Sequence, residues 1–423
     1  MLDFNKLSFD TFVNRIEYFV NNNKSEHYAG IGSRRILPKY FRLLTRISIF
    51  MAWRGRIFNS GGACGSDEAF ELGITLLCNE IKKHKPNFDD FKVKQHFQNI
   101  YVPWHGFRNL TPSTPGVILP PTDNQLVNES LNITKETHPN KNLSGPALNM
   151  MARNNFQALG NDLKSPVKCI ICFTPDGAGS SIKNPSNGKI ERSDITNKTG
   201  GTGQALRVGN KYNIPIHNIG NDTIYNEWYQ RLSDFDEKVF KLAFWGITTE
   251  QLVNDYLDNY IGFDNVIYDD LPLSIKEGKY NLDAMIHGCN CQCTMGSGIA
   301  KTVRQLFPDA YAEDCKTKKG DSSKLGNYSK LESIDDNNKP ITIINGYTQN
   351  KYGRQPVNKE PFVDYEKLRK LFVQINKDFK GKTIGIPKIG ATLAQGEWYI
   401  IQRLIAESTP DVNIVLFIYQ QPH

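Results

Sequence analysis

The sequence predicts an α/β protein of two domains, each a mostly parallel sheet flanked by helices. Short apolar runs that end in glycine are followed several times by amphipathic stretches, the pattern of parallel strands joined by crossover helices. The 423 residues, of which 39% are hydrophobic, exceed what one core normally holds. A stretch at about 222–262, dominated by helix formers, separates two such regions and is expected to be a helical connector.

The first region is expected to hold a short amphipathic helix in residues 1–26 and a Rossmann-like domain in 27–221. HYAGIGSR is a strand that ends in a glycine turn, and RIFNSGGACGSDEAFELG repeats strand, turn and helix. Residues 105–165 lose clear periodicity, which predicts an insertion or long loop. PVKCIICF resumes as a buried strand, and TGGTGQALRVGNKYNIPIHN reads as turn, helix and strand.

Three glycine turns of this domain are candidate ligand sites. Parallel strands present their carboxyl ends at one edge, so the first two turns should share a rim. Glycine lets backbone N–H groups approach a phosphate at a helix N-terminus, although such a turn can equally serve tight packing. Arg34 and Arg207 are the candidate phosphate partners, or they form structural ion pairs. The candidates are Gly32, Ser33 and Arg34; Ser60, Gly61, Gly62, Gly65 and Asp67; and Gly200, Gly201, Thr202 and Arg207.

The same motifs resemble the SLOG-like Rossmann superfamily, which includes the LOG enzymes and the DNA-processing protein DprA, over roughly residues 27–220. LOG enzymes cleave the glycosidic bond of nucleoside monophosphates and carry a PGGxGTxxE motif. Here Thr199, Gln204 and Arg207 replace its proline, threonine and glutamate. Departure of a base leaves oxocarbenium-like charge that a carboxylate should stabilise, so an arginine disfavours that reaction and suits a phosphate. The resemblance therefore implies a domain that binds a nucleotide or an NAD-derived signal.

The second domain is expected in residues 263–423. YNLDAMIHGCNCQCTMGSGIAKTV reads as a buried strand, a glycine turn and a helix, and further strands and helices alternate to the end of the chain. Cys289, Cys291 and Cys293 would share one face only if the strand continued past Asn290. Structural zinc sites usually take C-x2-C spacing with a second pair, which is missing here, so we predict no metal. A phosphate at the glycine turn is the favoured interpretation.

HGCNCQCTMGSGIAKTVRQLFP and IPKIGATLAQGEW resemble a macro domain of the type found in ADP-ribose 1''-phosphate phosphatases and ADP-ribosyl hydrolases. The resemblance covers essentially all of residues 263–423 and implies an ADP-ribose-type ligand. Two loops would clasp the diphosphate, an asparagine would contact the distal ribose, and an acidic residue would bind adenine. The matching residues are Gly296, Ser297, Gly298 and Ile299 in the first loop, Ile389, Gly390, Ala391 and Thr392 in the second, Asn290 for the ribose, and Asp283 or a near neighbour for adenine, with Tyr352 and Arg354 near the distal ribose.

Three residues are candidate catalytic groups. Glu397 stands where the family has an aspartate, and its longer side chain would put a general base in a different place. Lys388 and His287 are further candidates, although a histidine at the end of an apolar strand also reads as a core residue. The favoured activity is removal of the 1''-phosphate of ADP-ribose 1''-phosphate, without a cofactor. The alternatives are a non-catalytic binder or sensor of NAD-derived signals, and a hydrolase that removes ADP-ribose from protein or nucleic acid.

Composition narrows the setting. The net charge of +7 is spread along the chain, which disfavours nucleic acid as a partner, although the resemblance to DprA leaves single-stranded DNA as a further alternative. No run of about 18 apolar residues indicates a membrane span. Eight sparse cysteines argue against a disulfide framework and for a reducing cytoplasm, that of the host if a phage encodes the chain. A homo-oligomer remains possible.

Overall fold

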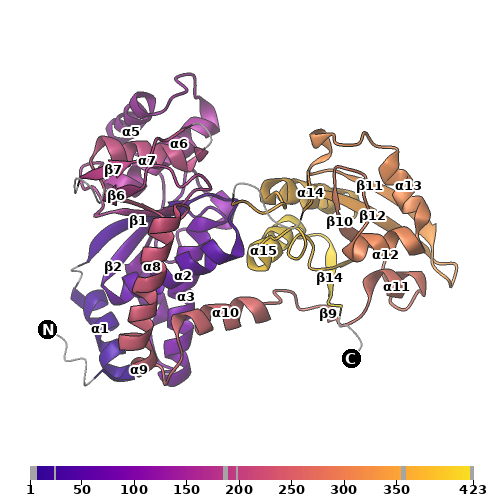
Figure 1. Cartoon of the computed structure of the whole chain (residues 1–423), viewed down its shortest axis with the longest axis horizontal. Helices are drawn as coiled ribbons and strands as arrows, with labels where there is room; N and C mark the ends of the chain where they lie inside the picture. Colours follow the sequence, from indigo (N-terminus) through magenta and orange to yellow (C-terminus); the bar gives the residue numbers. More distant parts are fainter. Residues whose placement is uncertain (1–6, 23–24, 184–188, 197–198, 354–358, 420–423) are drawn as a thin grey trace. The chain divides into compact units, whose positions relative to one another are not determined.

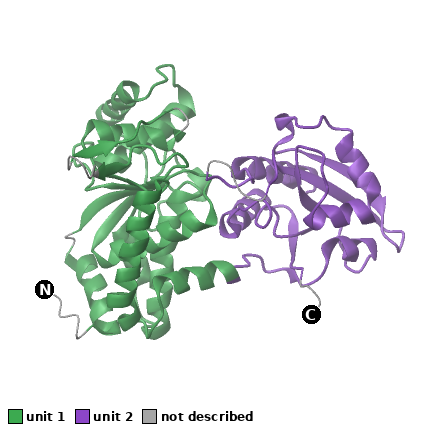
Figure 2. Ribbon diagram, in the orientation of Figure 1, with its two compact units in different colours: residues 1–258 green, residues 259–423 purple. Residues whose placement is uncertain are grey.

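The computed structural model divides the chain into two compact units, residues 1–258 and 259–423 (Figure 2). Each unit is α/β with a mainly parallel six-stranded sheet flanked by helices, so the predicted fold class is confirmed. Among the described residues, no helix combines the length and apolar character needed to cross a bilayer. The structure describes residues 7–22, 25–183, 189–196, 199–353 and 359–419.

The main sheet of unit 1 is parallel throughout, with the order β4-β3-β2-β1-β5-β8. Strand order reverses between β1 and β5, and such a switch point opens a crevice at the carboxyl ends of the two strands. A separate antiparallel pair is formed by β6 and β7. The strands are β1 (Glu26–Gly32), β2 (Arg56–Ser60), β3 (Gln98–Tyr101), β4 (Val117–Ile118), β5 (Ile170–Phe173), β6 (Ser181–Lys183), β7 (Ile190–Arg192) and β8 (Ile216–Asn218).

Helices connect and cover these strands. Apolar side chains of α2 are buried along most of its length, as are those of α3, and the two helices pack together. The helical segments of this unit are α1 (Phe9–Asn22), α2 (Pro38–Trp53), α3 (Ser66–His84), α4 (Asp90–Phe97), η2 (Phe107–Asn109), α5 (Asn124–Thr137), α6 (Gly145–Leu159), α7 (Thr202–Lys211), α8 (Asp222–Phe235), η4 (Asp236–Phe240), α9 (Lys241–Ala243) and α10 (Thr249–Asn259).

Of the two alternatives for residues 105–165, an insertion or a long loop, the long loop is wrong, because α5 and α6 form a helical pair there. Polar side chains hold the two helices together. The buried Asn155 amide donates to the Ser130 carbonyl oxygen at 2.8 Å and to Thr134 Oγ1 at 2.9 Å. An interface built on such hydrogen bonds produces no apolar periodicity in the sequence.

The segment 222–262 is expected from the sequence to be a connector. It packs against the middle of α2. Arg46 on α2 lies 3.1 Å from Asp236, and both side chains are only 4% exposed. Arg46 Nε also donates to Thr249 Oγ1 at 3.1 Å. This buried network ties α8, η4 and α10 to the helical layer of unit 1, whose last residue is Asp258.

Unit 2 has the sheet order β11-β12-β10-β13-β14-β9, in which only β11 runs antiparallel to its neighbour (Figure 1). One face of β10 contributes Met285 to an apolar core with α11, α12 and α13. The elements are β9 (Val266–Ile267), α11 (Leu271–Lys276), β10 (Ala284–Asn290), α12 (Gly298–Leu306), α13 (Pro308–Cys315), η5 (Ser322–Lys324), β11 (Tyr328–Ile334), β12 (Pro340–Gln349), α14 (Tyr365–Asp378), β13 (Thr383–Ile386), α15 (Trp398–Ser408) and β14 (Asn413–Phe417).

Candidate functional site

The carboxyl edge of the unit 2 sheet gathers the loops that follow three central strands. β10, β12 and β13 are parallel, so the segments after Asn290, Gln349 and Ile386 leave from the same edge. Ligands of open α/β sheets bind at this edge. The candidate site is therefore built from the β10–α12 turn and the loop between β13 and α15.

The β10–α12 turn is open to solvent. Gly296, Ser297 and Gly298 are exposed, and a Cβ added at Gly296 would meet no atom within 4 Å. Gly298 has φ +56° and begins α12, with Ser297 as its N-cap in extended conformation. Ile299 is half-buried on the first turn of the helix. The N-terminal N–H groups of a helix and its dipole favour an anion at such a turn.

The loop after β13 lies beside this turn. A Cβ at Gly298 would be 3.1 Å from Leu393 Cδ1, and a Cβ at Gly288 on β10 would be 3.2 Å from Ile389. Gly390 has φ +76° and its carbonyl oxygen accepts from Gly396 N–H at 2.9 Å, which closes the loop. The predicted loop residues Ile389, Gly390, Ala391 and Thr392 are thus brought to the predicted turn residues.

Asn290 shapes the segment between β10 and the turn. Its Oδ1 accepts from Gln292 N–H at 2.9 Å and from Thr294 Oγ1 at 3.1 Å. Its Nδ2 donates to the Thr294 carbonyl oxygen at 3.2 Å. The side chain therefore has a structural role in this loop, and the ribose contact stays a prediction.

Two of the three candidate catalytic residues are buried: His287, in agreement with the alternative interpretation as a core residue, and Glu397, contrary to the prediction of a reactive group. His287 is completely buried, and its Nε2 lies 2.9 Å from Asn345 Oδ1. Burial lowers the pKa of His287 to about 4, so the ring is neutral at neutral pH. Glu397 is 2% exposed and is the N-cap of α15, where its Oε1 accepts from Tyr399 N–H at 3.4 Å. Lys388 alone of the three is half-buried on the site loop, with Nζ 5.9 Å from the Trp398 ring centroid.

Asp283 is misplaced for the predicted adenine contact. It precedes β10 at the amino edge of the sheet, seven residues from Asn290, which corresponds to about 20 Å along a strand. Its carboxylate accepts from Thr383 N–H at 2.8 Å and from Lys382 Nζ at 3.1 Å. Asp269 and Asp270 come two and three residues after β9 and so follow the carboxyl end of that strand.

The remaining predicted residue of this edge is Tyr352, which is 60% exposed. Arg354 lies outside the described residues. The exposure of Tyr352 does not test the predicted contact with the distal ribose. The roles of Tyr352 and Arg354 therefore remain predictions.

The cysteine row is a packing feature of the sheet. Cys289 and Cys291 are buried with Met295 and Tyr347. Burial raises the pKa of both thiols, which disfavours the thiolate that metal ligation needs. Among the described residues, no group of three or more His, Cys, Asp or Glu side chains is arranged to hold a metal ion.

A buried polar cluster beneath the turn escaped sequence analysis. Lys324 Nζ lies 3.2 Å from Cys293 Sγ, 2.8 Å from Thr317 Oγ1 and 3.8 Å from Asp314 Oδ1. Tyr347 donates its hydroxyl to Asp314 at 2.9 Å. These groups come from four segments, and Lys324 stands in a polar stretch that gives no sign of burial.

In unit 1 the first two glycine turns share a rim, as predicted. Ser66 N–H donates to the Ser33 carbonyl oxygen at 3.2 Å, and a Cβ at Gly65 would be 2.6 Å from the Arg34 carbonyl oxygen. Gly32, with φ +156°, packs against Ser66 in the same way. Because each turn fills the space beside the other, their glycines serve close packing.

The turn after β2 is moreover occupied by the chain itself, contrary to the phosphate prediction. The N–H groups of Gly61 and Ala63 donate to the buried Asp67 carboxylate at 2.9 and 3.4 Å, and Gly62 N–H donates to Ser60 Oγ at 3.3 Å. Arg153 on α6 donates to the Gly61 carbonyl oxygen. A phosphate would have to displace these bonds.

The turn before α7 is open. Gly200, Gly201 and Arg207 line a cavity of about 460 Å³ together with His138, Asn140 and neighbours. Gly200 has φ +71°, and a Cβ there would meet no atom within 4 Å. Thr202 begins α7. Of the three predicted turns of unit 1, this one keeps space for a ligand.

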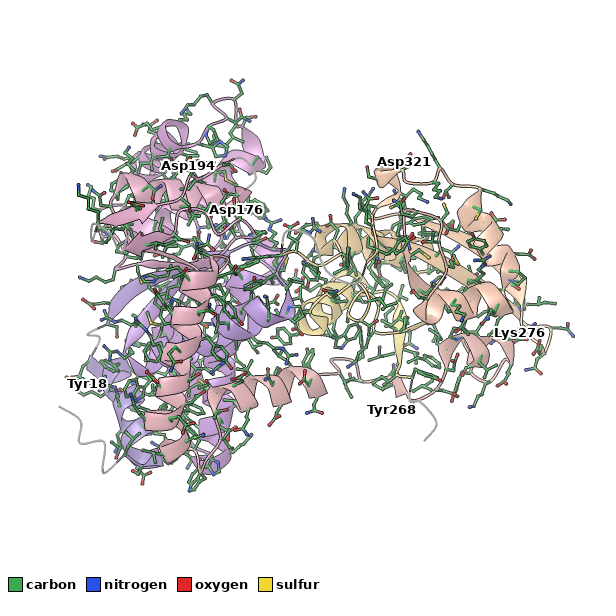
Figure 3. The ribbon with its side chains drawn as sticks, viewed as in Figure 1. Tyr18, Asp176, Asp194, Tyr268, Lys276 and Asp321 are labelled. Atoms are coloured by element: carbon green, nitrogen blue, oxygen red, sulfur yellow. The ribbon has the colours of Figure 1, made fainter. Side chains whose placement is uncertain are left out.

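A carboxylate beside this turn was missed by sequence analysis. Asp176, labelled in Figure 3, accepts from Thr199 Oγ1 at 2.7 Å and from Thr174 Oγ1 at 2.7 Å. Its position after β5 in TPDG, at the carboxyl edge of the sheet, is the signal that could have identified it. The Arg207 guanidinium donates to the Thr196 carbonyl oxygen at 3.2 Å, and burial lowers its pKa.

Comparison with known proteins gives one clear relative. No family model matches the chain. The "Uncharacterized 17.5 kDa protein in tk-vs intergenic region" of Enterobacteria phage T4 is 33% identical over 152 residues, which are 35% of this chain and 90% of that protein.

Solved structures that resemble part of the chain include macrodomains. The macrodomain of Thermus aquaticus DarG is 17% identical and covers 36% of this chain and 97% of its own, with a TM-score of 0.27. The macrodomain of Mycobacterium tuberculosis DarG is 20% identical, with coverages of 36% and 96% and a TM-score of 0.26. At TM-scores this low, the matches by themselves assign no function. The sequence match is stronger: over those 152 residues, the chain belongs to the same family as the phage T4 17.5 kDa protein.

Proposed function

We propose that unit 2 binds ADP-ribose, or a closely related NAD-derived nucleotide, at the carboxyl edge of its sheet. The observation that carries this proposal is the open turn at Gly296–Gly298, with the N-terminus of α12 behind it and the Gly390 loop beside it. Two adjacent backbone loops suit a diphosphate, which must approach N–H groups closely. The resemblance of HGCNCQCTMGSGIAKTV and IPKIGATLAQGEW to macro domains supports the same ligand.

Of the two alternatives, a non-catalytic binder and a hydrolase, the geometry favours the binder. His287 and Glu397, two of the candidate catalytic groups, are buried and engaged in the core and in a helix cap. Hydrolysis of ADP-ribose 1''-phosphate, the activity first expected, would rest on Lys388 and on a water held at the loop. Unit 1 would hold a second nucleotide or NAD-derived signal at the open turn of Gly200 and Gly201.

Calorimetric titration with ADP-ribose tests the proposal. Gly296→Val should leave the fold intact, because a Cβ there meets no protein atom within 4 Å, yet it should weaken binding by about tenfold or more by filling the approach to the turn. Lys380→Val is the control, because Lys380 is 72% exposed and precedes β13, which places it at the opposite edge of the sheet from both loops. Equal affinities in the wild type and Gly296→Val would place the ligand elsewhere.

Phosphate release from ADP-ribose 1''-phosphate separates the binder from the phosphatase. We expect tight binding of ADP-ribose with no release. Release that is lost in Lys388→Met but kept in Lys380→Met would instead establish the phosphatase. A substrate carrying ADP-ribose on protein or nucleic acid, assayed in parallel, distinguishes the remaining hydrolase alternative.

A further inference from the structure

A second cavity of unit 1 lies at the amino edge of the sheet, opposite the glycine turns. Its volume is about 420 Å³, within the range of small-molecule sites. It is bounded by the first residues of β1 and β2, the residues before β5, the end of α2 and the middle of α8. The lining residues are His27, Tyr28, Phe50, Met51, Arg54, Arg56, Lys168, Cys169, His217, Trp228 and Arg231.

Positive charge dominates this lining. Arg54, Arg56, Lys168 and Arg231 converge from four segments, and no lining residue is Asp or Glu. One carboxylate, that of Glu26, pairs with Arg56 and lies 3.3 Å from Lys168. The Glu26 carboxylate thus pairs with two of the four cations that line the cavity. Cations gathered in a concave surface raise the local concentration of anions.

The positive charges also affect the pKa values of His217 and Cys169, which line the same cavity. Burial is the main reason that the pKa of His217 is lowered, and the charge of Arg231 lowers it further. Arg56 and Arg231 both favour the thiolate of Cys169, although burial outweighs them and raises that pKa to about 11. The cations of different segments therefore act on common groups within one cavity.

A structural role explains only part of this arrangement. Cations stabilise the C-terminus of a helix, and Arg54 is the C-cap of α2. Arg56 and Lys168, however, belong to a strand and a loop, and no basic residue stands in the last turn of α8. Helix dipoles thus do not account for Arg56, Lys168 and Arg231, and the single carboxylate of Glu26 balances the charge of only one of its two partners, Arg56 and Lys168.

The floor of the cavity is apolar and aromatic. Tyr28 is 1% and Trp228 5% exposed, and the Arg231 guanidinium lies 5.0 Å from the Trp228 ring centroid. An apolar floor beneath a rim of guanidinium groups suits a ligand that combines a flat ring with a phosphate.

We propose that this cavity binds a phosphorylated ligand with a planar ring, which is the chemistry of a mononucleotide. The phosphate lies against Arg56, Lys168 and Arg54, and the ring lies toward Trp228 and Arg231. The site is separate from the turn of Gly200 and from the carboxyl edge of unit 2, and it does not depend on the function proposed for them.

Calorimetric titration of the full chain with 5′-AMP tests this site, with adenosine and inorganic phosphate as partial probes. Lys168→Ala and Arg231→Ala should each weaken AMP binding by about tenfold. Lys164→Ala removes the same charge from an exposed position on the same loop, outside the lining, and should change nothing. Lys168 is 66% exposed and Arg231 is exposed, so neither change threatens folding.

Three results would overturn the proposal. The first is that AMP does not bind. The second is an equal affinity in all three variants, which assigns binding to another site. The third is that Lys164→Ala weakens binding as much as Lys168→Ala, which indicates general charge attraction. If a single-stranded oligonucleotide displaces AMP and its binding falls steeply with salt concentration, the ligand of this cavity is nucleic acid and not a mononucleotide.

Discussion

The turn after β2 in unit 1 and the turn after β10 in unit 2 look alike in sequence but differ in what surrounds them. A Cβ at Gly61 would overlap the Arg153 guanidinium, whereas a Cβ at Gly296 would meet no atom within 4 Å. In the first turn the N–H groups are bonded to Asp67. In the second they stand at an exposed helix N-terminus. A glycine-rich turn after a parallel strand can thus be filled by its own protein or left for a ligand.

The difference is a matter of long-range contacts. Asp67 and Arg153 act on the closed turn as a substitute for a ligand, one binding its N–H groups and the other its carbonyl oxygen. Burial of two opposite charges is tolerated because each is hydrogen-bonded. Removing either partner should therefore have effects that the open turn does not show.

Asp67→Ala gives the largest expected change. It strips two buried N–H groups of their acceptor and leaves Arg153 without its counter-charge, which should lower the free energy of unfolding of unit 1 by about 4 kcal/mol. Asp309→Ala is the control, since Asp309 is also the second residue of a helix but is exposed. Hydrogen exchange during urea unfolding measures the loss of unfolding free energy in both variants. Similar small losses would mean that Asp67 only interacts with the helix dipole.

Gly61→Ala should cost unit 1 about 3 kcal/mol, because the added methyl group has to displace the buried Arg153 side chain. Hydrogen exchange of the β1 and β2 amide groups would report this loss. A loss of less than about 0.5 kcal/mol would mean that Arg153 moves freely and that the turn can open.

The pH dependence of unit 2 tests whether His287 belongs to the core under the open turn. The pKa of about 4 in the folded state lies below the ordinary 6.5, so only the unfolded chain takes up a proton as the pH falls between these values. Stability is complete above pH 6.5 and should fall by about 2 kcal/mol between pH 7 and pH 5. His287→Gln should remove this part of the dependence, as urea unfolding at the two pH values would show. Identical slopes in both proteins would contradict a neutral, buried ring.

Gly296→Ala should have the smallest effect on stability, within about 0.5 kcal/mol, since the methyl group points into open space. Thermal unfolding measured beside Gly61→Ala makes the pair a direct comparison of the two turns. A loss of stability as large as that of Gly61→Ala would show that the turn after β10 is also closely packed.

The alternation of strand, turn and helix could be predicted because it depends on local periodicity. β10 with its turn and α12, and β13 with its loop, lie where HGCNCQCTMGSGIAKTV and IPKIG place them. The position of Asp283 could also have been inferred, because a residue that precedes a strand lies at the edge opposite to one that follows it.

Which turn is open could not be read from the sequence. The turn after β2 is closed by Arg153, about ninety residues further along, on a helix whose polar interface concealed it. The burial of Glu397 has a similar origin: QGEW reads as a loop with a reactive carboxylate, whereas the carboxylate is the cap of α15 and the Glu397 N–H donates to the Tyr365 hydroxyl at 2.8 Å.

The edges of the two sheets bear on how copies of this chain can associate. β4 and β9 have two residues each and β8 has three, which is too short to template a partner strand. The longer edge strand, β11, carries Lys330 and Glu332 in a 2.7 Å ion pair, and such charges discourage edge-to-edge pairing. The described edges of the main sheets thus disfavour strand addition, and helices or loops are the better candidates for the interface of a homo-oligomer.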